Sequence, residues 1–173
     1  ELFNQAQTVI LTSATLAVGD QDFSFTRSRL GLTQSEELKL GSPFNYQEQV
    51  RLILPAAMPD PGENPAAYEA AVAEKLKQYI EQTDCHAFAL FTSYKMMQQC
   101  ADRISGWLSE HNLALYLQGD GLPRSLMLER FRNNPRGVLF GTDSFWQGID
   151  VPGDALTNVV ITKLPFSVPA HPP

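Results

Sequence analysis

The stretch CHAFALFTSYKMMQQCADRISGWL, residues 85–108, contains the unit from which the fold can be predicted. Residues 87–91 are apolar at every position, which is typical of a strand buried on both faces, as in a parallel sheet. Apolar side chains then recur at helical spacing, at Met96, Cys100, Ile104 and Leu108. A buried strand followed at once by an amphipathic helix is the repeating unit of an α/β fold.

The same alternation continues on both sides of this unit. Further short apolar runs predict strands at residues 9–11, 50–54, 113–117, 138–140 and 159–161. Helical patterns predict one helix after the cap pair Asn64-Pro65 and a shorter one from Pro123 to Phe131. We therefore expect an α/β fold with a doubly wound, mostly parallel sheet.

The pattern divides the chain into two parts. Residues 49–173 contain most of the strand and helix patterns, which predicts one compact domain. Residues 1–48 contain one strand pattern, a mixed segment and a polar link, and are interpreted as the end of a preceding domain. The proline-rich residues 165–173 are interpreted as a truncation point.

Composition limits the kinds of function that we expect. The 173 residues, 43% of them hydrophobic, are enough for one good core. No apolar run approaches the roughly 20 residues of a membrane-spanning helix, and the first residues show no signal peptide, so we expect an intracellular protein with no membrane partner. The net charge of −6 argues against a freestanding nucleic-acid binder, so any such contact is expected to be local.

The residue types that carry enzyme chemistry are sparse. Cys85 and Cys100 adjoin apolar residues, which favours buried, unreactive thiols. The three histidines have no partner at helical spacing, so we predict no metal site. The chain has no G-x-x-x-x-G-K-[ST] phosphate loop, no G-x-G-x-x-G fingerprint and no Ser/His/Asp set. Alone, it is not expected to build a site that hydrolyses a nucleotide.

Small polar residues follow several of the predicted strands, at the edge where open α/β sheets bind their ligands. Residues 12–15 (TSAT) form either a simple Ser/Thr turn or a ligand contact. Thr92 and Ser93 begin a helix, where they can cap it or bind a phosphate. The turn at residues 118–121 precedes arginines that can bind phosphate or lie on a solvated helix face.

The richest segment is GTDSFWQGIDVPG, residues 141–153. Phe145 and Trp146 are adjacent, so on a regular strand at least one of them faces another surface. Such a ring can stack on a base or pack against a neighbouring domain. Asp150 can accept from a ribose hydroxyl, orient an arginine across a cleft, or cap a turn.

Taken together, these segments resemble the DinG branch of the XPD-like superfamily 2 DNA helicases. Three segments are similar to helicase motifs III, IV and V: residues 11–16 (LTSATL), 91–94 (FTSY) and 141–150 (GTDSFWQGID). The run LFGTDSFWQGIDVPGDALTNVVITKLPF, residues 139–166, carries the strongest likeness. Gln118-Gly119 and LERF at residues 128–131 fit the same branch.

The resemblance implies an ATP-dependent DNA helicase with two RecA-like domains, helices on both faces of each sheet, and ATP with Mg²⁺ between the domains. Single-stranded DNA would cross both, with 5′–3′ movement in repair or replication, in the nucleoid of the cytoplasm. Residues 49–173 would be the second RecA-like domain, and residues 1–48 the end of the first. An iron–sulfur cluster, where present, would belong to the first domain.

The resemblance also carries over roles by position. The segment that couples ATP hydrolysis to strand movement is Ser13, Ala14 and Thr15. The residues expected to contact DNA are Thr92, Ser93, Tyr94, Thr142, Ser144, Phe145 and Trp146. Those expected to border ATP are Gly148 and Asp150.

Two departures limit the resemblance. Gln147 stands where relatives commonly have Glu, and the chain ends before the Q-x-x-G-R-x-I-R segment that supplies an arginine finger. We therefore predict that these 173 residues alone bind no cofactor and do not hydrolyse ATP. The alternatives are the motor-like domain of a DinG-type 3′–5′ exonuclease, a non-catalytic RecA-like binding module and, with no site to support it, a small-molecule enzyme.

Overall fold

The computed structural model describes residues 8–19, 22–83, 85–153 and 156–165. They belong to two compact units, Glu1–Leu54 and Pro55–Pro173. The proposal that residues 1–48 end a preceding domain stays a prediction. Most of residues 165–173, which we interpreted as a truncation point, lie outside the described part of the chain.

The second unit is built on a sheet of four parallel strands. They are β1 (Ala87–Leu90), β2 (Ala114–Leu117), β3 (Gly137–Gly141) and β4 (Asn158–Ile161). Their order across the sheet is β2-β3-β1-β4, so β3 lies between the two strands that precede it in sequence. This order confirms the expected parallel, doubly wound sheet.

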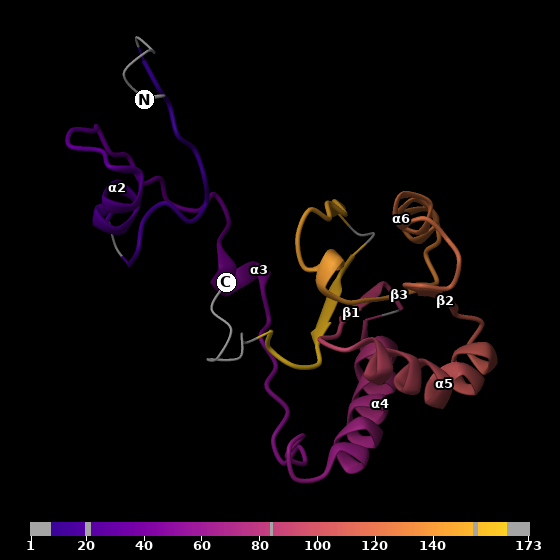
Figure 1. Ribbon diagram of the computed structural model, residues 1–173. Coiled ribbons are helices and arrows are strands. Elements are labelled where there is room, and N and C mark those ends of the chain that lie inside the picture. Colours follow the sequence, from indigo (N-terminus) through magenta and orange to yellow (C-terminus); the bar gives the residue numbers. More distant parts are fainter. Residues whose placement is uncertain (1–7, 20–21, 84, 154–155, 166–173) are drawn as a thin grey trace. The chain divides into compact units, whose positions relative to one another are not determined.

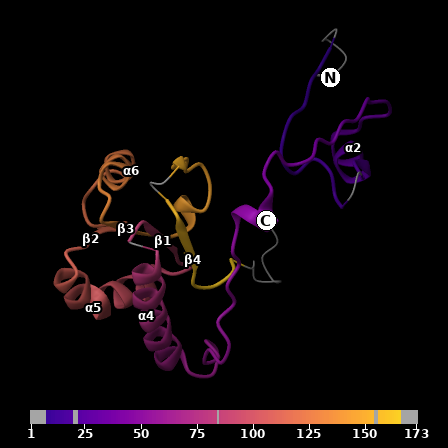
Figure 2. The same ribbon diagram turned by 180° about the vertical axis from the view of Figure 1, so that it is seen from behind.

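Helices cover both faces of this sheet. Helices α4 (Pro65–Gln82) and α5 (Tyr94–Glu110) lie on one face, and α6 (Arg124–Asn133) lies on the other (Figures 1 and 2). Side-chain caps begin the two long helices. Asn64 Oδ1 accepts from Ala67 N at 3.1 Å, and Ser93 Oγ accepts from Met96 N at 3.5 Å. The three predicted helices of this unit are confirmed.

The core explains why the strand residues are apolar at consecutive positions. Successive side chains of β1 point to opposite faces: Ala87 and Ala89 pack toward α4 and α5, whereas Phe88 and Leu90 pack toward α6. All five residues of β3 are buried as well. Because helices cover both faces of these two central strands, apolar side chains are favoured on either face, and the usual alternation of an exposed sheet is lost.

The first unit differs from the sequence prediction. Its described residues form α2 (Ser24–Leu30), α3 (Tyr46–Gln49) and one antiparallel bridge between Val18 and Asp22. The strands predicted at residues 9–11 and 50–54 are wrong, because both segments are extended without a neighbouring strand to hydrogen-bond. Ile10 is 81% exposed and Leu52 is 80% exposed. An apolar run forms a strand only where a neighbouring strand is available to hydrogen-bond with it.

Two properties of the described residues bear on function. No described helix is both long and apolar enough to cross a membrane. Within residues 8–19, 22–83, 85–153 and 156–165, no three His, Cys, Asp or Glu side chains come close enough together to hold a metal ion.

Candidate functional site

The carboxyl ends of the parallel strands form one edge of the sheet, and polar residues follow each strand there. Backbone hydrogen bonds tie these exits together: Phe91 N donates to Gly141 O at 2.9 Å, and Gln118 N donates to Phe140 O at 3.0 Å. On the other side of β1, Thr162 N donates to Leu90 O at 3.0 Å. The segments resembling motifs IV and V therefore lie side by side, as expected for ligand-binding loops of an open α/β sheet.

The motif IV residues lie between the end of β1 and the start of α5. Thr92 is half-buried, and Ser93 and Tyr94 are exposed. Ser93 caps α5, which was one of its two predicted roles, and its hydroxyl hydrogen is not used by that cap. The Tyr94 ring lies near the neighbouring turn, because a Cβ added at Gly119 would be 3.4 Å from Tyr94 Cε1.

The two aromatic residues of motif V both pack toward their own domain. Residues Asp143–Phe145 form a 3₁₀ turn, so the alternation expected of a strand does not apply. Phe145 is only 2% exposed and packs edge-on against Phe88, with ring centroids 6.1 Å apart. In this structure the buried Phe145 ring offers no face to a base, and the predicted contact of Phe145 with DNA stays a prediction.

Trp146 connects motif V, to which it belongs, with motif IV. Its indole Nε1 donates to Phe91 O at 3.3 Å, and the half-buried ring packs against the same apolar cluster as Phe145. The side chain thus joins the end of β1 to the loop after β3. The predicted contact between Trp146 and DNA stays a prediction.

Gly141 permits the close approach that buries Phe145. A Cβ added at Gly141 would lie 2.6 Å from Phe145 Cγ and 2.7 Å from Phe145 Cβ. Real Cβ atoms do not come so close to other atoms, so a glycine is required here by packing. The close approach turns the chain inward at Phe145, and Ser144, next to it, is exposed.

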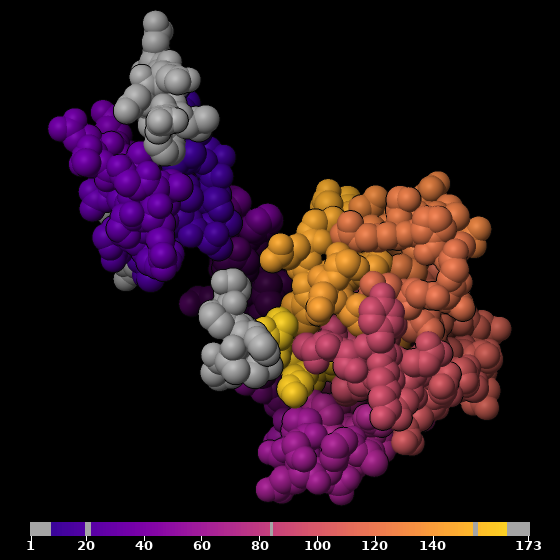
Figure 3. Space-filling model, viewed as in Figure 1, coloured from indigo at the N-terminus to yellow at the C-terminus, as the bar shows by residue number. Residues whose placement is uncertain are grey.

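Two arginines of α6 hold the rest of the motif V loop. Arg124 Nη2 donates to Gln147 O at 3.0 Å and to Gly148 O at 3.2 Å, and its guanidinium lies 5.3 Å from the centroid of the Phe145 ring. Arg132 donates to the carbonyl oxygen of Asp150. In the space-filling view, the light-orange atoms of this loop adjoin the darker orange of α6 (Figure 3).

These contacts place the residues that were predicted to border ATP. Gly148 has φ of 66°, a left-handed conformation that favours glycine. Asp150 is exposed, and the α6 contact uses its backbone carbonyl rather than its carboxylate. From the sequence, we expected these arginines to bind phosphate or to lie on a solvated helix face. The carbonyl contacts could not be predicted, because backbone partners leave no signal in a sequence.

Gln118 also has a role at this edge of the sheet, and its contacts could not be predicted from the sequence. Its Oε1 accepts from Thr142 N at 2.6 Å and from Thr142 Oγ1 at 3.0 Å. Its Nε2 donates to Ser144 Oγ at 3.0 Å. One amide at the end of β2 therefore holds both motif V hydroxyls after β3. The only sequence signal was the family resemblance of Gln118-Gly119.

The coupling segment is described within the first unit alone. Ser13, Ala14 and Thr15 are exposed. Thr15 N donates to Ser13 Oγ at 3.2 Å, and the two hydroxyl oxygens are 3.3 Å apart. This geometry is that of a Ser/Thr turn. The predicted coupling role stays a prediction.

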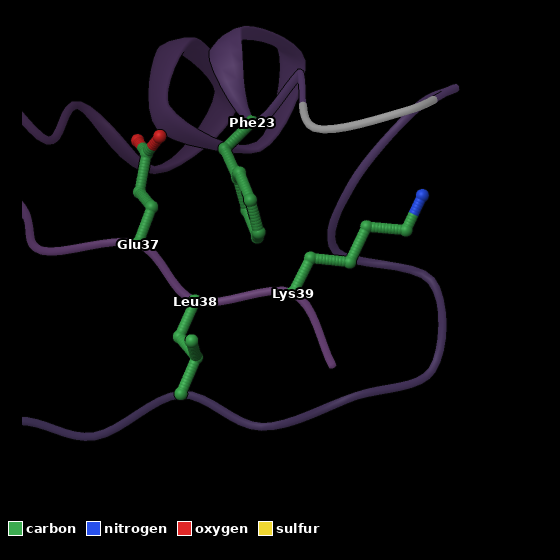
Figure 4. Close-up of a pocket in the computed structure, with 4 residues that line it drawn as sticks. All are labelled: Phe23, Glu37, Leu38 and Lys39. Atoms are coloured by element: carbon green, nitrogen blue, oxygen red, sulfur yellow. The ribbon is translucent and has the colours of Figure 1, made fainter. Parts of the chain in front are cut away.

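A small hollow in the first unit is lined by two charged side chains that both contact other groups. It measures about 190 Å³ and is lined by Phe23, Glu37, Leu38 and Lys39 (Figure 4). Glu37 is paired with Arg27 at 3.2 Å, and Lys39 donates to the Gly19 carbonyl. We assign it no function.

The cysteine side chains are both buried, as predicted. Burial raises the pKa of the Cys100 thiol to about 11, and the nearby Glu69 carboxylate adds to the effect. A thiol with so high a pKa carries almost no thiolate near neutral pH and is a poor nucleophile.

Comparison with known proteins identifies the family. Residues 76–173 match the family described as "Helicase C-terminal domain". The chain belongs to this family, which agrees with the DinG-type resemblance in its sequence.

Curated relatives extend the similarity to nearly the whole chain. The "ATP-dependent DNA helicase YoaA" of Escherichia coli (strain K12) is 38% identical over 94% of this chain and 24% of its own length. The "ATP-dependent DNA helicase DinG" of Photobacterium profundum is 34% identical over 99% of this chain and 25% of its own. The "3′-5′ exonuclease DinG" of Bacillus subtilis is 33% identical over 99% of this chain and 19% of its own length. The chain thus spans a quarter or less of these relatives' lengths.

Proposed function

We propose that this chain is the second RecA-like motor domain of an ATP-dependent DNA helicase, with residues 1–48 ending the first motor domain. The observation that supports this most directly is the carboxyl edge of the sheet. There, exposed hydroxyls of motifs IV and V lie on neighbouring strand exits, in a chain whose family is that of helicase C-terminal domains. The full polypeptide then moves 5′–3′ on single-stranded DNA during repair or replication, in the nucleoid of the cytoplasm.

In this proposal the nucleotide chemistry is shared between two domains. The phosphate loop and Mg²⁺ ligands come from the first motor domain of the same polypeptide, as does an iron–sulfur cluster where one is held. This chain contributes the Gly148–Asp150 side of the ATP cleft. The two arginines of α6 support that side through the backbone, which leaves the Asp150 carboxylate exposed for a ribose hydroxyl or an arginine across the cleft.

The test is the DNA-stimulated ATPase of the full polypeptide carrying Asp150→Ala. We expect turnover to fall at least tenfold, which corresponds to about 1.4 kcal/mol of transition-state stabilisation. The melting temperature should not change, because Arg132 holds the carbonyl of Asp150, which alanine retains. The matched control is Asp102→Ala, an exposed carboxylate on α5, which should leave turnover intact. Unchanged turnover in Asp150→Ala would contradict this role.

A second candidate is the motor-like domain of a DinG-type 3′–5′ exonuclease. The similarity to the Bacillus subtilis protein named 3′-5′ exonuclease DinG favours it. The two candidates differ in the product formed by the full polypeptide from an end-labelled partial duplex. A helicase releases an intact labelled strand and needs ATP, whereas an exonuclease shortens the strand from its 3′ end.

A further inference from the structure

The orientation of the Gln118 side-chain amide is settled by one of its partners. Backbone N–H groups only donate, so the amide atom 2.6 Å from Thr142 N must be the oxygen. Nε2 therefore faces Ser144 Oγ, 3.0 Å away. An amide nitrogen only donates, so the Ser144 oxygen accepts in that bond.

This polarity gives the two motif V hydroxyls opposite roles. Thr142 Oγ1 lies 3.0 Å from Gln118 Oε1, which only accepts, so Thr142 uses its single hydroxyl hydrogen on that bond. Thr142 is also only 4% exposed. Ser144 is exposed and keeps its hydroxyl hydrogen, because its oxygen is the acceptor of the Gln118 bond. A phosphate oxygen is an acceptor and can use only the second kind of hydroxyl.

We infer that Gln118 is a positioning residue that makes Ser144, and not Thr142, the motif V hydroxyl that donates to a DNA phosphate. The inference rests on the proposed function, because it names which side chain carries the predicted DNA contact. Thr142 then serves as a link between the ends of β2 and β3. The exposed serine on the 3₁₀ turn is held with its hydrogen directed away from the protein's own amide.

The test compares substitutions in the full polypeptide, using a fluorescently labelled oligothymidylate and anisotropy at fixed low salt. Ser144→Ala should raise the Kd by about three- to tenfold, the effect of one lost hydrogen bond. Ser144→Thr keeps the hydroxyl and should restore binding. Thr142→Val should lower the melting temperature yet leave the Kd within about twofold, because its hydroxyl is used inside the protein.

Gln118→Glu tests the polarity itself. A carboxylate still accepts from Thr142, but its second oxygen also accepts and therefore takes the Ser144 hydrogen away from DNA. We expect a Kd raised at least as much as by Ser144→Ala, with little further loss when the two are combined. Gln147→Glu adds the same charge within the motif V loop and should weaken binding less, since neither hydroxyl is bonded to that side chain among the described contacts.

The outcomes separate the inference from the proposed function. If the unsubstituted polypeptide binds oligothymidylate and Ser144→Ala binds equally well, Ser144 is not the donor. If Thr142→Val weakens binding as much as Ser144→Ala does, the opposite roles are wrong. If the unsubstituted polypeptide does not bind at all, the proposed function fails, and the assignment of Ser144 fails with it.

Discussion

Gly141→Ala tests whether the packing at the end of β3 is as tight as the structure shows. The added Cβ would lie 2.6 Å from Phe145 Cγ, whereas ordinary van der Waals contact begins at 3.4 Å. The Phe145 side chain, its Cβ included, must therefore move by roughly 1 Å, or the strand must move away from it. The ring has little freedom to do so, because it is buried, packs against Phe88 and lies beneath the Arg124 guanidinium.

The expected magnitude follows from this overpacking. Forcing extra volume into a well-packed core costs about 1–3 kcal/mol. For a chain of this length, each kcal/mol lowers the melting temperature by about 2–4 °C, so Gly141→Ala should melt about 2–12 °C lower. Thermal denaturation followed by circular dichroism measures this shift directly.

Gly106→Ala is the matched control. Gly106 lies in the middle of α5, and a Cβ added there meets nothing within 4 Å. Alanine in a helix interior is about 0.5–1 kcal/mol more favourable than glycine, so this variant should melt higher. The same substitution of glycine by alanine is thus expected to lower the melting temperature at residue 141 and to raise it at residue 106.

The same substitution at Gly141 is then measured in a protein that also carries Phe145→Ala. Once the ring is absent, Gly141→Ala should cost clearly less, because the clashes with Cγ and Cδ2 are gone and only the 2.7 Å approach to the Cβ of residue 145 remains. An unchanged melting temperature for Gly141→Ala alone would refute the reasoning. An equal cost with and without the Phe145 ring would refute it as well.

Three further predictions concern the contacts around the site. Trp146→Phe should destabilise the fold by at least about 0.5–1.5 kcal/mol in urea denaturation, because phenylalanine lacks the Nε1–H that donates to Phe91 O and its ring is smaller; an unchanged midpoint would show that neither the bond nor the larger ring contributes. Arg124→Met should increase proteolysis in the loop around Gln147 and Gly148, whereas Arg130→Met, for which no loop contact is described, should not. Equal cleavage of the two arginine variants would show that Arg124 does not hold this loop. Stability should fall as pH rises from about 9 toward 11, because the pKa of Cys100 is raised from 9.0 to about 11 and the folded state therefore resists ionisation. In Cys100→Ala, which lacks the thiol, this part of the pH dependence should disappear.

The fold of the second unit could be predicted well because its signals are local. Consecutive apolar residues in β1 and β3 indicate strands buried on both faces, and Asn64 and Ser93 begin helices by contacts within a few residues. The first unit was predicted less well. The extended residues 9–11 and 50–54 carry the same apolar signal, but a strand also needs a hydrogen-bonding neighbour, which local sequence does not reveal.

For the candidate site, too, some features could be predicted from the sequence and others could not. Sequence by itself determined the α/β class, the order of the motifs and the placement of hydroxyl residues after the strands, because each depends on residue type and spacing. Only the tertiary structure decided that Phe145 is buried, that Arg124 holds backbone carbonyls, and that Gln118 gives Thr142 and Ser144 opposite hydrogen-bonding roles. These contacts join residues more than twenty positions apart in the sequence. Which group donates and which accepts is set only when folding brings the two partners together.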